Sequence, residues 1–252
     1  KTIAIWNTTS FERVATLVGH AFPITAVGFS PDSRWLVSLS GDTRDGAIVW
    51  RTDSWTVGHI LPNEAIGWGN VAFTRAGLCI LHTAVWNIET GTAVESLGKY
   101  LEDRSWLSLS PDSTRAITIA GDGIVRFLDY SSRRQIVEYP AHRDHGRAVA
   151  YSPDGTLAAS GAEDVVLWDA VTTKKLCRLP YTSIVWGLAF SPDSRWLVST
   201  HGDGAVLIWD AAERERVANL NEHCAPVRGI AFSPDGQRIV TTSEDGSAIV
   251  WN

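Results

Sequence analysis

The sequence contains no methionine and only three cysteines, Cys79, Cys177 and Cys224. The cysteines lie far apart and form no CxxC pair, so we expect neither a disulfide framework nor a zinc site, and free buried thiols in a reducing cytoplasm fit best. No apolar run approaches the length of a membrane span, and none resembles a secretory signal, so no membrane partner is expected. Because an initiating Met is also missing, we expect the natural polypeptide to begin upstream of Lys1.

Positive charge is also scarce, since 22 Lys and Arg residues face 28 Asp and Glu residues and the net charge is −6. Binding of nucleic acid needs a basic surface that neutralises phosphate charges, so no nucleic-acid partner is expected. Apolar residues make up 44% of the chain, which predicts a globular protein with a substantial core. Tryptophan, in contrast, is abundant: twelve copies of so large a side chain indicate a position that recurs along the sequence.

A repeat accounts for this abundance. The stretch FSPDSRWLVSLSGD at 29–42 returns as FSPDSRWLVSTHGD at 190–203. The first residue of the SPD element, or of its degenerate relative, falls at Ser30, Thr74, Ser110, Ser152, Ser191 and Ser233. A second marker, Trp-Asp or a relative, falls at Trp6, Trp50, Trp86, Leu128, Trp168, Trp209 and Trp251. Two markers that keep one period of about 40 residues identify a repeat architecture.

Each period reads as four short strands with alternating apolar residues, separated by turn sequences. In 186–220 these strands are WGLAFS, WLVST, AVLIWD and RVANL. One small antiparallel sheet cannot bury both of its faces, so each unit must stack on its neighbours. A ring of such sheets leaves only short edges exposed. The fold class predicted is therefore all-β, with stacked four-stranded antiparallel sheets in a single domain over 1–252.

In these features the chain resembles the WD-repeat β-propellers, and the resemblance covers essentially all residues. The period, the SPDG turn, the Gly19-His20 pair before an inner strand and the terminal Trp-Asp all match. The seven Trp markers favour a seven-bladed propeller whose first blade is truncated in this chain. The alternative is six blades, with 13–18 completing the blade that ends at Trp251. The resemblance implies that an upstream segment supplies the outer strand of that last blade.

The resemblance also implies a set of four hydrogen-bonded side chains within a blade: His, Ser or Thr, Asp, and Trp. Three sets can be filled, and we predict a structural role for them: His20, Ser38, Asp45 and Trp50; His142, Ser160, Asp164 and Trp168; His223, Thr241, Asp245 and Trp251. A Ser-His-Asp triad is the competing interpretation, but nucleophiles do not recur in every copy of a repeat. Two repeats depart from the pattern, because Tyr100 and Tyr181 stand where His is expected. Near His82 one repeat is shortened, by a tight turn or by missing residues.

WD-repeat propellers commonly meet their partners where the inner strands begin, around the central channel. Counting back from each SPD element assigns the partner-binding candidates Thr25, Asp103, Ser105, His145, Arg147, Trp186 and Arg228, with His201 and Glu244 on nearby turns. Trp186 is the anchor we favour, because interface hot spots favour Trp and Arg. Packing against Tyr181 is its alternative role. Arg147 and Arg228 flank Trp186 from neighbouring repeats, which would suit an acidic or C-terminal peptide.

No cofactor or metal ion is expected, because no phosphate-binding loop occurs and His82 and His201 lack a second ligand at suitable spacing. The chain is interpreted as a non-catalytic, cytoplasmic interaction scaffold or sensor that binds a protein or peptide, a monomeric domain and the C-terminal sensing part of a larger protein. One alternative is an architectural role through oligomer formation. A hydrolase that uses Asp103 and His145 at the channel mouth is the least favoured hypothesis.

Overall fold

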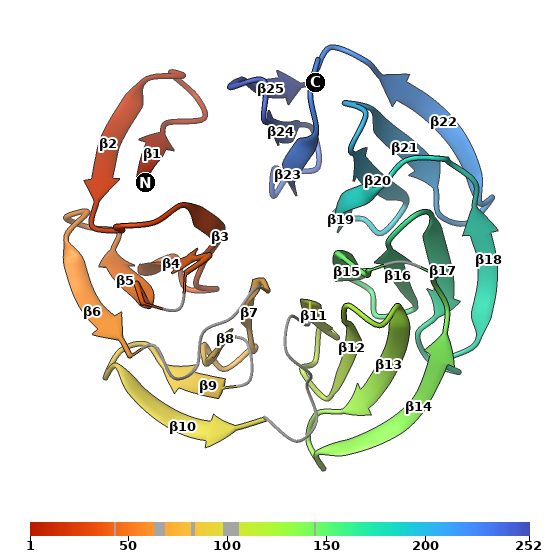
Figure 1. Cartoon of the computed structure of the whole chain (residues 1–252), viewed down its shortest axis with the longest axis horizontal. Coiled ribbons are helices and arrows are strands. Elements are labelled where there is room, and N and C mark those ends of the chain that lie inside the picture. Colours follow the sequence, from red (N-terminus) through yellow and green to blue (C-terminus); the bar gives the residue numbers. More distant parts are fainter. Residues whose placement is uncertain (43, 63–68, 82–83, 98–105, 144) are drawn as a thin grey trace. The chain divides into compact units, whose positions relative to one another are not determined.

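The computed structural model describes residues 1–252 except 43, 63–68, 82–83, 98–105 and 144. All regular secondary structure in the described residues is β-strand, and all strand pairs are antiparallel, which confirms the all-β prediction (Figure 1). The chain divides into two compact units, Lys1–Arg104 and Ser105–Asn252. The described part contains no helix with the length and apolar character that a membrane span requires.

The first unit contains one two-stranded sheet and two four-stranded sheets. The two-stranded sheet consists of β1 (Thr2–Trp6) and β2 (Arg13–Val18). The next sheet has the strands β3 (Ile24–Phe29), β4 (Trp35–Ser40), β5 (Ala47–Arg51) and β6 (Val57–Leu61). The third has β7 (Val71–Phe73), β8 (Cys79–Leu81), β9 (Ala84–Asn87) and β10 (Thr92–Ser96).

The second unit contains three four-stranded sheets and one three-stranded sheet, and consecutive strands are neighbours in each. Its first two sheets are β11 (Trp106–Leu109), β12 (Arg115–Ile119), β13 (Ile124–Asp129) and β14 (Arg134–Pro140), then β15 (Ala148–Tyr151), β16 (Leu157–Gly161), β17 (Val165–Asp169) and β18 (Lys175–Leu179). The last two are β19 (Val185–Phe190), β20 (Trp196–His201), β21 (Val206–Asp210) and β22 (Glu215–Leu220), then β23 (Val227–Phe232), β24 (Ile239–Ser243) and β25 (Ala248–Trp251). Within this unit β11, β15, β19 and β23 are successive neighbours, and β14, β18 and β22 lie outermost (Figure 1).

The two sequence markers fall where the repeat predicts. Each of the seven Trp-marker positions lies in a different sheet, on β1, β5, β9, β13, β17, β21 or β25. Five of these sheets have the expected four antiparallel strands. Residues 13–18, which would complete the last sheet in a six-repeat arrangement, instead pair with β1.

The core lies between successive sheets. Strand β4 is buried at all six positions, whereas the outermost strand β10 is almost entirely exposed. One apolar cluster joins Val37 of β4 and Val49 of β5 to Leu81 of β8. Within each unit, neighbouring sheets bury apolar side chains against one another, so the apolar area that stabilises the fold depends on the stacking.

The SPD element forms the turn between the first and second strands of a repeat. In the first copy the Ser30 hydroxyl donates to Asp32 at 2.5 Å and accepts the Trp35 N–H at 3.0 Å. The fourth residue of the turn needs a positive φ: it is Ser33 with φ 59° here, Gly77 with φ 82° in the degenerate turn of the next repeat, and Gly155 with φ 76° after Asp154. The alternation of SPDS and SPDG along the sequence therefore marks a left-handed backbone position, which glycine adopts without strain.

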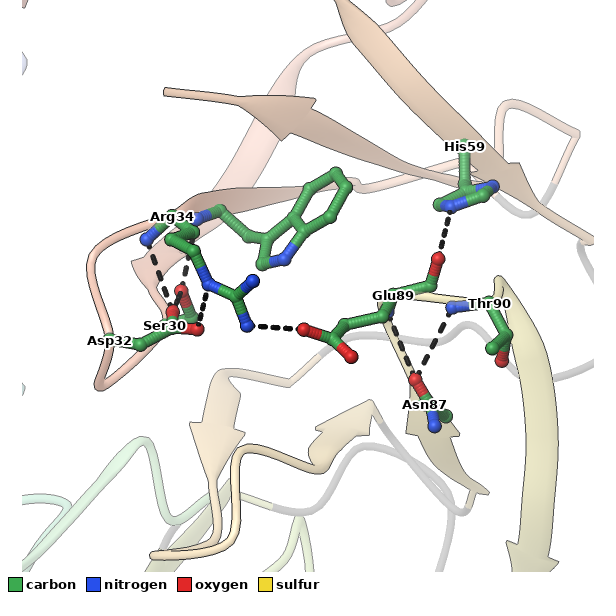
Figure 2. Close-up of polar contacts among 8 residues, drawn as sticks. Ser30, Asp32, Arg34, His59, Asn87, Glu89 and Thr90 are labelled. Atoms are coloured by element: carbon green, nitrogen blue, oxygen red, sulfur yellow. Dashed lines mark hydrogen bonds and ion pairs between the residues drawn. The ribbon is translucent and has the colours of Figure 1, made fainter. Parts of the chain in front are cut away.

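Polar contacts also join the sheets β3–β6 and β7–β10 of the first unit (Figure 2). Arg34 forms an ion pair with Glu89 and a second one, at 2.6 Å, with Asp32. His59 Nε2 lies 2.9 Å from the Glu89 carbonyl oxygen, and the backbone N–H of Glu89 donates to Asn87 Oδ1 at 3.0 Å. These groups satisfy one another, so we interpret the cluster as a link between sheets.

Candidate functional site

Three of the predicted partner-binding residues occupy the same special position in their strands. The register between first and second strands shifts at Thr25 in β3, at Trp186 in β19 and at Arg228 in β23. Each is the extra residue of a β-bulge, and a bulge re-aims its side chain out of the regular alternation. The inner strands β3, β19 and β23 therefore each carry, near their start, one side chain outside the regular alternation.

In the second unit, two arginine side chains lie against the indole ring of Trp186. The Trp186 ring has the guanidinium carbon of Arg228 3.4 Å from its centroid and that of Arg147 4.6 Å from it. Arg147 directly precedes β15, whereas Trp186 lies on β19 and Arg228 on β23. These three inner strands are successive neighbours (Figure 1). Stacking on the electron-rich face of Trp stabilises a guanidinium and fixes its plane.

Glu244 belongs to the same cluster. Its Oε1 accepts hydrogen bonds from Arg228 Nε at 2.8 Å and from Arg228 Nη2 at 2.5 Å. Both side chains of this pair are about half exposed. The other arginine, Arg147, forms no ion pair with a described residue, and its buried Nε has no acceptor among them. Trp186 Nε1 is likewise buried without an acceptor in the described part of the chain.

The structure also places the remaining candidates. His145 is exposed and lies two residues before Arg147, and Thr25 is exposed in the first unit. Asp103 and Ser105 lie outside the described residues, as do Tyr100 and the shortened turn at His82. The alternative role for Trp186 is not realised, because the Tyr181 ring packs against His201 at 4.5 Å and its hydroxyl donates to Asp203.

His201 is placed differently from its prediction. The sequence assigned it to a surface turn among the partner-binding residues, but the side chain is fully buried. Its Nε2 lies 2.9 Å from the Ser199 hydroxyl, which also accepts the Trp209 indole N–H at 2.9 Å. Burial lowers the pKa of His201 to about 4. The imidazole therefore replaces the one that Tyr181 cannot provide, and it is not available to a partner.

The three predicted sets of four side chains are assembled by the structure. In the first, the His20 ring lies 3.0 Å from Asp45 and 2.7 Å from the Ser38 hydroxyl, which accepts the Trp50 indole N–H at 2.8 Å. The third repeats this with His223, 2.8 Å from both Asp245 and Thr241. In the second, His142 Nε2 lies 2.9 Å from the Ser160 hydroxyl, which accepts the Trp168 indole N–H at 3.0 Å, but His142 Nδ1 has no hydrogen-bond partner among the described residues. We interpret these contacts as stabilising the sheets rather than activating a nucleophile.

Hydrogen bonds hold the aspartates of these sets in the ionised form. Burial raises the pKa of Asp45, but the backbone N–H groups of Ala21 and Phe22 and the His20 ring outweigh it and leave the pKa below its usual value. For Asp245 the Ser247 hydroxyl is the largest cause of a strongly lowered pKa, and the His223 ring adds to it. Both carboxylates are thus acceptors over the whole neutral range.

The second set carries an additional carboxylate. His142 Nδ1 lies 3.2 Å from Asp164 and 3.7 Å from Glu163, and the three ligand atoms lie within 4.8 Å of one another. A divalent cation could approach such a group, but the Arg178 guanidinium already contacts both carboxylates. We therefore interpret the cluster as an ion-pair network and assign no metal to it.

An apolar hollow lies beside the last sheet, between β22 and β25. Its volume is about 320 Å³, and its lining includes Trp196, Ile208, Leu220, Phe232 and Trp251. Strand β25 pairs with β24 alone in the described part of the chain. The hollow thus lies beside the strand β25, where the other sheets have a fourth, outer strand. We interpret it as a packing surface of the fold.

Comparison with known proteins gives family matches within both units. The family described as "WD domain, G-beta repeat" matches residues 11–49, 174–210 and 214–252. These matches confirm the resemblance to the WD-repeat family: the chain carries WD40 repeats.

Similar proteins include several named RACK1. The chain is 28% identical over 127 residues to "Small ribosomal subunit protein RACK1" of Caenorhabditis elegans, which covers 48% of this chain and 39% of the relative. It is 41% identical over 81 residues to RACK1z of Arabidopsis thaliana, covering 31% and 24%. "MST50-interacting protein 11" of Pyricularia oryzae is 29% identical over 122 residues, covering 48% and 38%. The chain thus spans between a quarter and two fifths of these relatives' length.

Proposed function

We propose that this chain of WD40 repeats is a non-catalytic protein-interaction scaffold whose partner contacts the Arg147, Trp186 and Arg228 surface. The observation that carries the proposal is the convergence of these side chains from three successive inner strands on one ring. Interface hot spots are enriched in Trp and Arg, and side chains held in place before binding lose less freedom on association. The names of the relatives support a scaffold, since one is described as an interacting protein and others as ribosomal subunit proteins.

The proposal extends to the cell compartment. We propose a cytoplasmic location, which the ribosomal subunit names of the RACK1 relatives support. The three cysteines are free thiols, which suits a reducing compartment, but only Cys79 is buried and Cys224 is exposed, contrary to the expectation of buried thiols.

The test is partner capture by an immobilised chain, with bound proteins identified by mass spectrometry. We expect Trp186→Ala combined with Arg228→Glu to abolish capture, because the ring and one of its two cations are lost. The melting temperature should fall by about 2–4 °C, because Arg228 is exposed and Trp186, although partly buried, is not one of the buried core residues. Lys175→Glu, an exposed charge reversal on β18, is the matched control and should capture normally. Undiminished capture by the double variant would place the partner surface elsewhere.

A further inference from the structure

We propose that the Arg147, Trp186 and Arg228 surface recognises a carboxylate side chain of an acidic peptide, and that Glu244 occupies part of this site until the peptide displaces it. The inference rests on the proposed function and assigns a chemical class to the partner. Three observations carry it: the charge balance of the cluster, the donors of Arg147 that no described residue uses, and the exposure of the Arg228–Glu244 pair.

The cluster has more positive charge than its own residues balance. Two guanidiniums lie against one indole, and the only carboxylate that the described residues place on them is Glu244. Glu244 pairs with Arg228, while Arg147 forms no ion pair within the described residues. One positive charge is therefore available to an anion at the start of β15.

The stacking decides where the donors point. A guanidinium that lies over a ring keeps its N–H groups in its own plane, so they are directed past the edge of the indole. Arg228 uses Nε and Nη2 on a single oxygen of Glu244. Arg147 Nε and Trp186 Nε1 are buried polar groups with no acceptor among the described residues. The Nη groups of Arg147, a side chain that is only partly buried, are the donors that an incoming carboxylate can reach, and no described residue pairs with them.

The Glu244 pair is suited to exchange. Both partners are about half exposed, and water and salt screen ion pairs of this kind. Replacing one carboxylate by another at Arg228 keeps the same two hydrogen bonds. An acidic peptide then gains the contact with Arg147, which Glu244 does not make.

Surfaces that combine arginine with an aromatic ring also bind single-stranded RNA. The observations favour a peptide, because the chain carries a net charge of −6 and Glu244 lies within the cluster itself. A long phosphate backbone would be repelled by both, whereas a short acidic peptide can place one or two of its carboxylates on the two guanidiniums. RNA binding is therefore a result that would contradict the proposal.

The experiment measures binding of a fluorescein-labelled hexaglutamate peptide to the full 252-residue chain by fluorescence anisotropy at low and physiological salt. We expect Glu244→Gln to tighten binding about two- to fivefold, because the internal competitor is removed. Arg147→Gln and Arg228→Gln should each weaken it about tenfold. Lys175→Gln on β18 is the control and should leave affinity unchanged, and melting temperatures verify that each variant is folded.

Several results would overturn the inference: no binding of hexaglutamate, equal binding of hexaglutamine, equal binding of an oligouridylate, or weaker binding after Glu244→Gln. Its failure is distinguishable from failure of the proposed function. If Trp186→Ala with Arg228→Glu abolishes partner capture while Arg147→Gln and Glu244→Gln leave partner affinity unchanged, the binding surface stands and its acidic specificity is wrong.

Discussion

His201 shows that the buried imidazole of a repeat can come from a different position in the sequence and still make the same hydrogen bond to a Ser hydroxyl. Three repeats take their buried imidazole from the segment before the inner strand, but the repeat of β19–β22 takes it from the end of β20. Side chains two apart on a strand share a face, so His201 lies on the same side as Ser199. The two-residue spacing between Ser199 and His201 is consistent with a hydrogen bond between their side chains. Alignment with the other repeats instead places Tyr181 at the histidine position.

The buried imidazole makes stability depend on pH. In the folded chain burial lowers the pKa of His201 to about 4 from an ordinary 6.5, so between these values the unfolded chain takes up a proton that the folded chain does not. Stability is therefore lost as the pH falls from 6.5 towards 4, by about 2 kcal/mol between pH 7 and pH 5. Urea unfolding at pH 7, 6 and 5 measures this slope.

The matched variants are His201→Asn and Lys175→Gln. His201→Asn should lower stability at pH 7 but flatten the slope between pH 7 and pH 5, because the titrating group is gone. Lys175→Gln changes an exposed side chain and should keep the wild-type slope. A wild-type slope in His201→Asn would mean that other groups cause the acid sensitivity.

At the scale of the element, the SPD turn is the most regular feature and the one that the sequence predicts best. The serine, the aspartate and the left-handed residue after it recur with the same bonds, because the turn needs both an internal acceptor and a positive φ. The bulges at Trp186 and Arg228 were not predicted, since a one-residue register shift leaves no signature in the alternation of apolar residues.

The turns offer a paired test of backbone strain. Ser33→Gly should raise the free energy of unfolding by about 0.5–1 kcal/mol, because a left-handed residue other than glycine costs more than the flexibility that glycine adds. Gly77→Ala should lower it by about 1–2 kcal/mol. An added Cβ at Gly77 meets no atom within 4 Å, so the loss would come from the backbone alone. Thermal or urea unfolding of both variants checks this, and equal signs for the two would contradict it.

For the molecule as a whole, the repeat predicted the sheets, the placement of each Trp marker in a separate sheet, and the proximity of Arg147, Trp186 and Arg228. This succeeded because equal spacing from an SPD element places side chains at equivalent points of adjacent sheets. The Arg228–Glu244 pair was not predicted, because it depends on side-chain directions at a bulge and a turn. The single domain over 1–252 remains a prediction.

The measurement that tests the central claim most directly is hydrogen–deuterium exchange of the chain with and without its captured partner. On binding, we expect slower exchange at the starts of β15, β19 and β23, around Arg147, Trp186 and Arg228. Exchange of the outer strands β14, β18 and β22 should not change. Protection confined to those outer strands, with none around Trp186, would contradict the account.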